Sequence, residues 1–147
     1  MELRVKRFHE LTTDELYRIL KLRVSVFVVE QNCPYQELDD RDRDALHVWF
    51  EDQDGIQAYL RILDRGAVSE HVAIGRVIAV KRRRGTGSRI VSEGIRIAKE
   101  IFGTEKIYVE AQVYAKGMYE KLGFRQISDE FTEDGIPHVK MLLDCIP

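Results

Sequence analysis

The sequence predicts an α+β fold with a mixed sheet, and three observations support this prediction. Along the 147 residues, short apolar runs alternate with longer amphipathic segments, as strands and helices do. In the second half they follow the order strand, helix, strand, which implies parallel pairing. Near both ends, two apolar runs are separated by a turn signal, which implies antiparallel hairpins. A chain of this length builds one compact unit, so residues 1–147 are expected to form a single domain.

The first forty residues predict a strand followed by a helix. Residues 3–8 alternate apolar and basic side chains, which is typical of a half-exposed strand. Thr12 and Glu15 have the spacing of a capping box, so a helix is expected to begin here. Apolar residues recur at helical spacing as far as Val28, and the helix is expected to extend to that point.

An irregular segment and a hairpin are expected next. Residues 33–44 are acidic and irregular and predict a loop with a short helix at most. Two apolar runs, 46–50 and 56–63, flank the dipeptide Asp54-Gly55, a strong turn signal. These runs are therefore expected to pair as an antiparallel hairpin.

The central segment predicts a strand that feeds a basic loop and then a helix. The apolar run 72–80 leads directly into the basic, glycine-containing residues 81–87. From Ile90 to Phe102 the apolar residues lie on one helical face, and Gly103 occupies the position of a left-handed C-cap.

The last third predicts three strands and a short helix. They are a strand at 107–111, a helix at 115–122 closed by Gly123, and strands at 124–131 and 139–143 around the turn 133–135.

Composition excludes several classes of protein. With 44% hydrophobic residues, 33% charged residues and 3 prolines, the chain is typical of a globular domain. Its apolar runs are far shorter than the roughly 20 residues of a membrane span, and no apolar signal core follows the basic N-terminus. We therefore expect a cytoplasmic protein without a membrane partner. Cys33 and Cys145 lack metal-ligand spacing, so no metal cofactor is expected.

Charge is balanced overall but unevenly distributed. The formal net charge is −2, yet segment 37–54 is acidic and segment 81–89 is basic. A nucleic-acid binder usually carries a net basic charge spread along a face, so the basic segment favours a local anionic ligand and no nucleic-acid partner. The acidic segment 37–44 has two interpretations. It either attracts a cationic substrate to the mouth of the site or is an ordinary solvated loop.

The junction at residues 80–88 carries the strongest chemical signal. A strand, a glycine turn and a helix N-terminus together present unpaired N–H groups and the positive end of the helix dipole. Gly85 and Gly87 let the backbone approach a phosphate closely, and the neighbouring arginines add charged donors. The pattern fits neither the dinucleotide-binding glycine fingerprint nor the P-loop. A turn with a solvated basic run is the alternative interpretation.

Two motifs in this region resemble the GNAT superfamily of N-acetyltransferases. Residues 82–87, Arg-Arg-Arg-Gly-Thr-Gly, match that family's Gln/Arg-x-x-Gly-x-Gly/Ala cofactor loop. Gln112-x-x-Ala115-x-x-x-Tyr119 is similar to its Asn-x-x-Ala-x-x-x-Tyr element, with glutamine in place of asparagine. Other segments, including 28–36 and 133–138, look like the ElaA-type branch, and the resemblance covers essentially the whole chain.

The resemblance implies the GNAT acyl-CoA N-acyltransferase fold, a three-layer domain whose central parallel strands splay apart around acetyl-CoA. It also implies roles for particular residues. Ile78, Ala79 and Val80 would pair with the pantetheine amides, and Arg83, Arg84, Gly85, Thr86, Gly87 and Ser88 would hold the pyrophosphate. Tyr119 would lie near the thioester sulfur, and Gln112 would keep an amide for hydrogen bonding to the cofactor. A homodimer is an expectation of the family.

Direct acetyl transfer to an amine requires a proton acceptor and a proton donor. At pH 7 an alkylammonium with a pKa near 10.4 is deprotonated in only about one part in 2,500. The leaving thiolate needs a proton, which the Tyr119 hydroxyl can supply. The candidate bases are His138, Glu110, Glu30 and His47. Glu110 can act directly or through water, and His138 lies on the turn that enters a late strand.

The sequence therefore predicts an acetyl-CoA-dependent N-acetyltransferase. Its acceptor is a small amine, an amino acid, or a peptide or protein amine. One alternative is a non-catalytic acyl-CoA-binding sensor of the same fold. Another is a nucleic-acid binder that uses residues 81–84.

Overall fold

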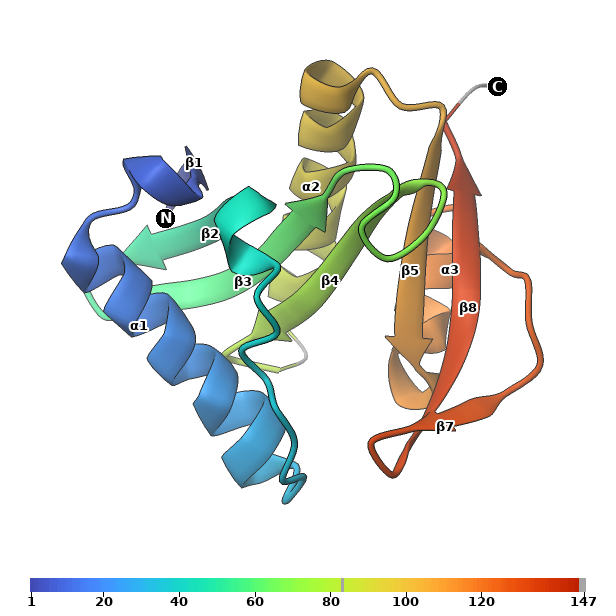
Figure 1. Ribbon diagram of the computed structural model, residues 1–147, viewed down its shortest axis with the longest axis horizontal. Coiled ribbons are helices and arrows are strands. Elements are labelled where there is room, and N and C mark those ends of the chain that lie inside the picture. Colours follow the sequence, from blue (N-terminus) through green and yellow to red (C-terminus); the bar gives the residue numbers. More distant parts are fainter. Residues whose placement is uncertain (83, 146–147) are drawn as a thin grey trace.

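We analysed a computed structural model that describes residues 1–82 and 84–145. These residues form a mixed sheet with helices on both faces (Figure 1). The strands are β1 (Glu2–Arg7), β2 (Leu46–Asp52), β3 (Gly55–Leu63), β4 (Val72–Ala79), β5 (Lys106–Gln112), β6 (Arg125–Gln126), β7 (Phe131–Glu133) and β8 (Ile136–Asp144). The α-helices are α1 (Thr13–Val24), α2 (Thr86–Phe102) and α3 (Lys116–Lys121). Shorter helical turns are η1 (Phe8–Glu10), the π-helical η2 (Ser25–Glu30), η3 (Asp42–Asp44) and η4 (Val113–Ala115).

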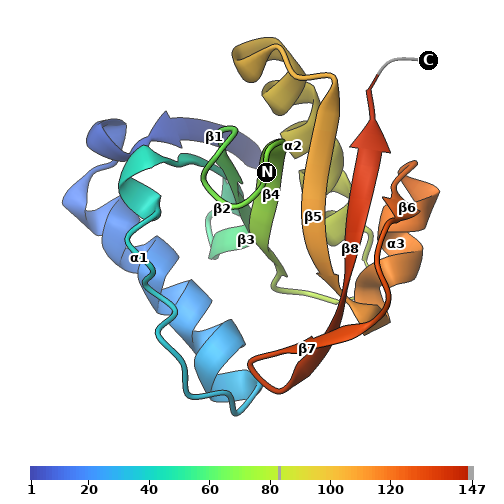
Figure 2. The same cartoon turned by 45° about the vertical axis from the view of Figure 1, so that its right-hand side comes forward.

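The strands are ordered β1-β2-β3-β4-β5-β8-β6, and β7 pairs with β8. Neighbouring strands are antiparallel except β4 and β5, which are parallel. The α1 helix covers one face of the sheet, while α2 and α3 lie on the other, as Figures 1 and 2 show. We call these the α1 face and the α2 face. None of the helices in residues 1–82 and 84–145 has the length and apolar character needed to cross a bilayer.

The α2 face holds the main apolar core. Alternate residues of β3, namely Ala58, Leu60 and Ile62, are fully buried there and belong to one cluster with Ile90 of α2. Gly94 explains the close approach of the helix, because a Cβ atom at this position would lie 2.8 Å from Leu60 Cδ2.

The central strands separate soon after they pair. β4 and β5 pair only at Val72 with Ile107 and at Ala73 with Tyr108, and then they diverge (Figure 1). An irregularity in the β3–β4 pairing lies just beyond this point, and Arg76 there has a left-handed backbone with φ of +55°. A bulge bends and twists the strand that carries it. The bulge in β4 therefore accompanies the separation of the two strands.

The helix boundaries largely follow the sequence predictions. Thr12 caps α1 through the predicted capping box with Glu15. Gly103 ends α2 with φ of +58°, as expected. The first helix changes to π-helical geometry at Ser25, within the β-branched run, and continues to Glu30.

The predicted strand 124–131 is wrong. The structure has two shorter strands, β6 and β7, which both pair with β8. Between them, the Ser128 hydroxyl accepts a hydrogen bond from the Lys140 N–H at 2.9 Å, where a strand would offer a backbone carbonyl. This local side-chain bond replaces the β ladder and lets the chain leave the sheet.

Candidate active site

A cleft of about 1470 Å³ opens where β4 and β5 diverge. Its walls come from β4, the start of α2, β5, α3, η2 and the β7–β8 turn. Most of the predicted site residues line it: Ile78, Ala79, Val80, Gly85, Thr86, Gly87, Ser88, Glu110, Gln112, Tyr119 and His138. Arg83 lies outside the described residues, and Arg84 is exposed beside the glycine turn.

The glycine turn at one end of the cleft is built to face an anion. Gly85 has a left-handed backbone with φ of +74°, and α2 begins at the next residue. The Arg89 N–H makes the first helical bond, to the Gly85 carbonyl. The N–H groups of residues 86–88 therefore have no acceptor within the helix and point out of its N-terminus. This arrangement fits the predicted pyrophosphate turn.

The backbone of β4 presents polar groups to the gap. Val80 donates to the Gln57 carbonyl, so it forms a hydrogen-bonded pair with β3. Hydrogen-bonded and non-hydrogen-bonded pairs alternate along antiparallel strands. The next pair, Ala79 with Ala58, is therefore a non-hydrogen-bonded pair. The N–H and carbonyl of Ala79 thus point away from β3 and face the gap. Among the three residues predicted to bind pantetheine, Ala79 has this orientation.

Tyr119 lies beneath the gap on α3. Its side chain packs edge to face against Phe124, with ring centroids 5.5 Å apart, and the residue is only 5% exposed. Burial raises the pKa of the Tyr119 hydroxyl, so it remains protonated at neutral pH. The residue also lines the cleft, so this hydroxyl is a proton donor available to a ligand there.

His138 lies opposite Gln112 in the β5–β8 register and also lines the cleft. Its Nδ1 is 2.7 Å from the Ile136 carbonyl oxygen. Because a carbonyl can only accept a hydrogen bond, Nδ1 carries the proton, and Nε2 of the neutral ring keeps its lone pair. Nε2 is 3.8 Å from Glu133 Oε2, so an acid and a candidate proton acceptor lie side by side here.

Two carboxylates share the His138 side of the cleft. The Tyr108 hydroxyl donates a hydrogen bond of 3.2 Å to Glu110 on β5. Burial and the neighbouring charge of Glu110 raise the pKa of the Glu133 carboxyl. Glu110, Glu133 and His138 thus form a region that can bind an ammonium group and remove its proton.

Two contacts join the turn after η2 to the far wall of the cleft. The side-chain amides of Gln31 and Gln112 bond to each other reciprocally, at 3.3 and 3.4 Å. Cys33 donates a thiol hydrogen bond of 2.9 Å to the Asp134 carbonyl. No local sequence signal predicts the role of Gln31, because its partner Gln112 lies 81 positions away.

The remaining base candidates differ in position. Glu30 is exposed at the rim of the cleft, 3.9 Å from Arg82. His47 is fully buried, bonded to the Tyr59 hydroxyl and the Asp42 carbonyl, and it is not among the described residues that line the cleft. The proposal of His47 as a base is therefore wrong.

Both interpretations of the acidic segment 37–44 are also wrong for its main carboxylates. Glu37 is 2% exposed, and it bonds to the guanidinium groups of Arg23 and Arg76. Asp42 is buried between Arg23 and Arg61. These groups form one arginine–carboxylate cluster on the α1 face, which consists of Arg23, Arg41, Arg61, Arg76, Glu37, Asp39 and Asp42.

The cluster keeps its carboxylates ionised. Burial alone would raise the pKa of the Asp39 carboxyl, but hydrogen bonds and charge from Arg61 outweigh it and hold the pKa well below its usual range. Arg23 and Arg61 lower the pKa of Asp42 against burial in the same way. Glu37, Asp39 and Asp42 thus neutralise arginines of α1, the following loop and the sheet, and they are not free to attract a substrate.

Comparison with known proteins follows from this geometry. The profile of the acetyltransferase (GNAT) domain matches residues 13–145. The chain belongs to the GNAT acetyltransferase family. A GNAT relative, protein ElaA of Escherichia coli, is 38% identical over 141 residues, which cover 93% of this chain and 92% of ElaA. A UPF0039 protein of Mycobacterium tuberculosis is 42% identical over 139 residues, covering 90% and 86% of the two chains.

Solved structures agree with the family and its fold. The crystal structure of an acyl-CoA N-acyltransferase from Pseudomonas aeruginosa matches with a TM-score of 0.90 and 35% identity, covering 97% and 99% of the two chains. Escherichia coli ElaA matches with the same values. An aminoglycoside 6′-N-acetyltransferase complexed with coenzyme A shares the fold at 13% identity, with a TM-score of 0.72 and 98% coverage of both chains. The predicted GNAT fold, with its splayed parallel strands, is thus confirmed.

Proposed function

We propose that this GNAT protein transfers the acetyl group of acetyl-CoA directly to a primary amine. The observation that carries the proposal is the cleft between β4 and β5, which joins an anion-binding helix N-terminus to a buried tyrosine and a histidine. An extended thioester with a phosphate-bearing end fits such a cleft. The coenzyme A bound to an aminoglycoside acetyltransferase of the same fold supports the choice of cosubstrate.

Residues of the chain would bind the two ends of acetyl-CoA differently. The N–H groups of residues 86–88 and the Arg84 side chain would hold its pyrophosphate. The backbone groups of Ala79 would pair with the pantetheine as a neighbouring strand would, because the β4 edge is unpaired there. Bound acetyl-CoA supplies an activated acyl group and a thiolate leaving group.

Tyr119 would act as the proton donor and His138 as the proton acceptor. The Tyr119 hydroxyl would donate a proton to the departing sulfur, since burial keeps it protonated. His138 Nε2 would take a proton from the acceptor ammonium, and Glu133 would stabilise the resulting imidazolium. Glu110, on the same side of the cleft, is the alternative base, acting directly or through water.

Two measurements test the proposal. Acetyl-CoA at about 100 times its dissociation constant should stabilise the protein by roughly 2.7 kcal/mol and raise its Tm by about 5–10 °C, whereas ATP and NAD should not. Thiol release with a panel of primary amines should then show turnover, which His138→Gln reduces. A Tm shift without turnover on any amine would favour the non-catalytic sensor, and no Tm shift would overturn the cosubstrate assignment.

A further inference from the structure

The cleft extends beyond the reacting centre into a region that the cosubstrate would not use. Its lining there includes Arg41 and Arg61, with Asp39 between them, and Leu63, Ala73 and Gly75. Leu63 and Ala73 belong to a small apolar cluster with Tyr108. We call this region the acceptor end, because it continues from the reacting centre on the α1 face.

Gly75 creates the open space at the acceptor end. A Cβ atom built on Gly75 would meet nothing within 4 Å, although the residue lies in the middle of a central strand. Arg61 is its register partner on β3. On the other side, Ala73 pairs with Tyr108, so Gly75 and Glu110 are each two residues further along the parallel strands. Arg61 and Glu110 thus lie on the same face of the sheet on either side of Gly75, across the gap that opens where β4 and β5 diverge.

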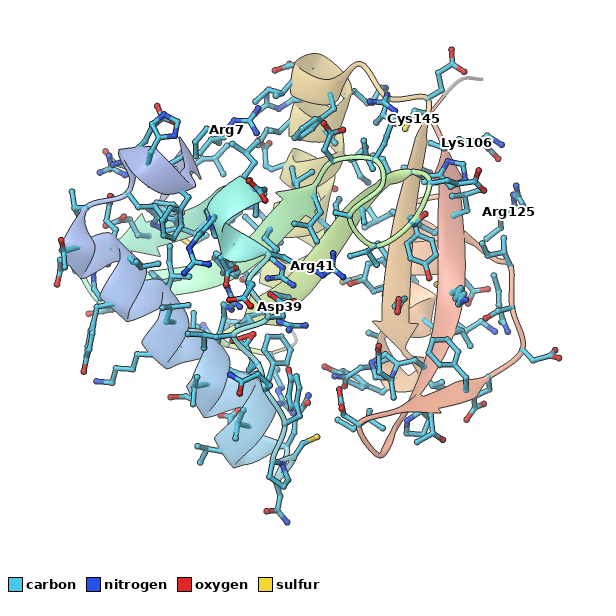
Figure 3. The ribbon with its side chains drawn as sticks, in the orientation of Figure 1. Arg7, Asp39, Arg41, Lys106, Arg125 and Cys145 are labelled. Carbon is cyan, nitrogen blue, oxygen red and sulfur yellow. The ribbon has the colours of Figure 1, made fainter. Side chains whose placement is uncertain are left out.

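One wall of this space is positively charged. In the arginine–carboxylate cluster four arginines meet three carboxylates, which leaves an excess of one positive charge, four minus three. Arg41 is its most accessible member, with a side chain 44% exposed. Arg41 lies over β4 (Figure 3), where it donates to the Ala67 carbonyl of the β3–β4 loop. Its backbone N–H donates to Asp39 Oδ1 at 3.2 Å, but the ion pair of its guanidinium with Asp39 is long at 4.0 Å.

The opposite wall is negatively charged. It carries Glu110, Glu133 and the proton-accepting Nε2 of His138. A ligand that spans the space therefore meets a guanidinium at one side and carboxylates at the other, with an apolar floor between them. An amine that also carries a carboxylate matches both walls.

We propose that the acceptor is a free α-amino acid with an apolar side chain, an inference that rests on the proposed function. Its carboxylate would bind Arg41, its side chain would lie on Leu63 and Ala73, and its amine would face His138 and Glu110. The ammonium gives one proton to the base. The nitrogen then bonds to the acetyl carbon and the carbon–sulfur bond breaks. The thiolate takes a proton from Tyr119, and the nitrogen's second proton restores Tyr119 through water, so one proton in all reaches the solvent.

The test compares acceptors that differ only in the carboxylate. Thiol release with phenylalanine and leucine is measured beside phenethylamine, isopentylamine and phenylalaninamide. We expect kcat/KM to be at least tenfold higher for the two amino acids, and Arg41→Gln to reduce this preference to about one, mainly by raising KM. Arg43→Gln is the matched control, because Arg43 lies on the same segment but is 70% exposed and paired with Asp40.

Gly75→Leu provides a second, independent test. A Cβ atom at Gly75 would meet nothing within 4 Å, so the new side chain can start without a clash and would extend into the acceptor end, and we expect the fold to be retained. We expect KM for the amino acid to rise at least tenfold, while the Tm shift with acetyl-CoA is unchanged.

Equal or better turnover of the amines without a carboxylate would overturn this inference and leave the proposed function standing. Acetyl-CoA binding with no turnover of any amine would overturn both.

Discussion

The two faces of the sheet are built from different chemistry, and strand β3 shows the contrast within one element. Its residues Ala58, Leu60 and Ile62 point to the α2 face and are buried in the apolar core. Tyr59 and Arg61 point to the α1 face, where Arg61 joins the arginine–carboxylate cluster. Both faces are covered by helices, so the difference does not come from exposure to solvent.

The two faces contribute differently: the α2 face mainly stabilises the fold, and the α1 face mainly fixes the geometry beside the cleft. Apolar packing on the α2 face is non-directional and holds α2 against the sheet. The charged cluster on the α1 face gains little net stability after desolvation, but it fixes segment 37–44 beside the cleft through directional bonds. The face that carries the acceptor end is therefore the face with the more exacting geometry.

The largest effect on activity is expected at Tyr119, whose hydroxyl enters the comparison from α3 on the α2 face. Tyr119→Phe should lower kcat by about 10²–10⁴ while leaving the affinity for acetyl-CoA and the Tm nearly unchanged, because the ring packing is kept. Steady-state thiol release at saturating acetyl-CoA measures this. Tyr114→Phe, which removes an exposed hydroxyl from the same cleft, is the control. Unaltered turnover of Tyr119→Phe would remove the general-acid assignment.

The next largest effect is expected in the charged cluster. Arg23→Met should reduce the free energy of unfolding by about 3–5 kcal/mol, because Glu37 and Asp42 would keep buried charges without their partner. Ile19→Val, at another fully buried position of α1, should reduce it by only about 0.5–1.5 kcal/mol. Urea unfolding of both variants measures the difference, and equal losses would contradict the asymmetry between charged and apolar packing.

A pair of glycines tests how tightly each face is packed. Gly94→Val should destabilise the protein by about 1–3 kcal/mol, because even a Cβ atom there would lie 2.8 Å from Leu60 Cδ2. Gly75→Val should leave the free energy of unfolding nearly unchanged, since its Cβ would meet nothing within 4 Å. Thermal unfolding of the two variants provides the comparison. A similar Tm for both would show that the packing around Gly94 accommodates a side chain as readily as the open space at Gly75.

The smallest effect is expected from pH, and it should arise on the α1 face. The pKa values of Asp39 and Asp42 are lowered in the folded state, so the unfolded chain binds more protons in acid. Their contribution to stability is full above the unfolded carboxyl pKa near 4 and is lost as pH falls through the folded pKa values. Tm should therefore fall from pH 6 to pH 3. Asp39→Asn should make this fall less steep, and an unchanged slope would contradict the assignment.

Much of the fold was predictable because its signals are local. The capping box before α1, the glycine that ends α2 and the Asp54-Gly55 hairpin each depend on residues a few positions apart. The strand predicted over 124–131 failed because a Ser128 side chain, bonded to Lys140, replaced a backbone acceptor. Such a substitution depends on a residue 12 positions away, beyond the reach of a local pattern.

The site divides in the same way. The glycine turn and Tyr119 were found from short motifs, and the structure places both in one cleft. The arginine–carboxylate cluster was missed, because Glu37 finds Arg76 across 39 positions and no spacing rule connects them. The acidic composition of segment 37–44 was visible, but composition alone does not show which charges are neutralised.

The two residue pairs between β4 and β5 also bear on how the protein avoids unwanted association. Unpaired strand edges invite strands of other chains to add to a sheet, and this sheet has two such edges in its middle. Each inner edge faces the other, and the contacts of Gln31 and Cys33 tie the segment after α1 across the opening. A strand of another protein would have to enter the gap between the two halves of the sheet to reach either edge. A gap that a slender, chain-like ligand can enter lengthwise thus restricts the access of other proteins to these edges.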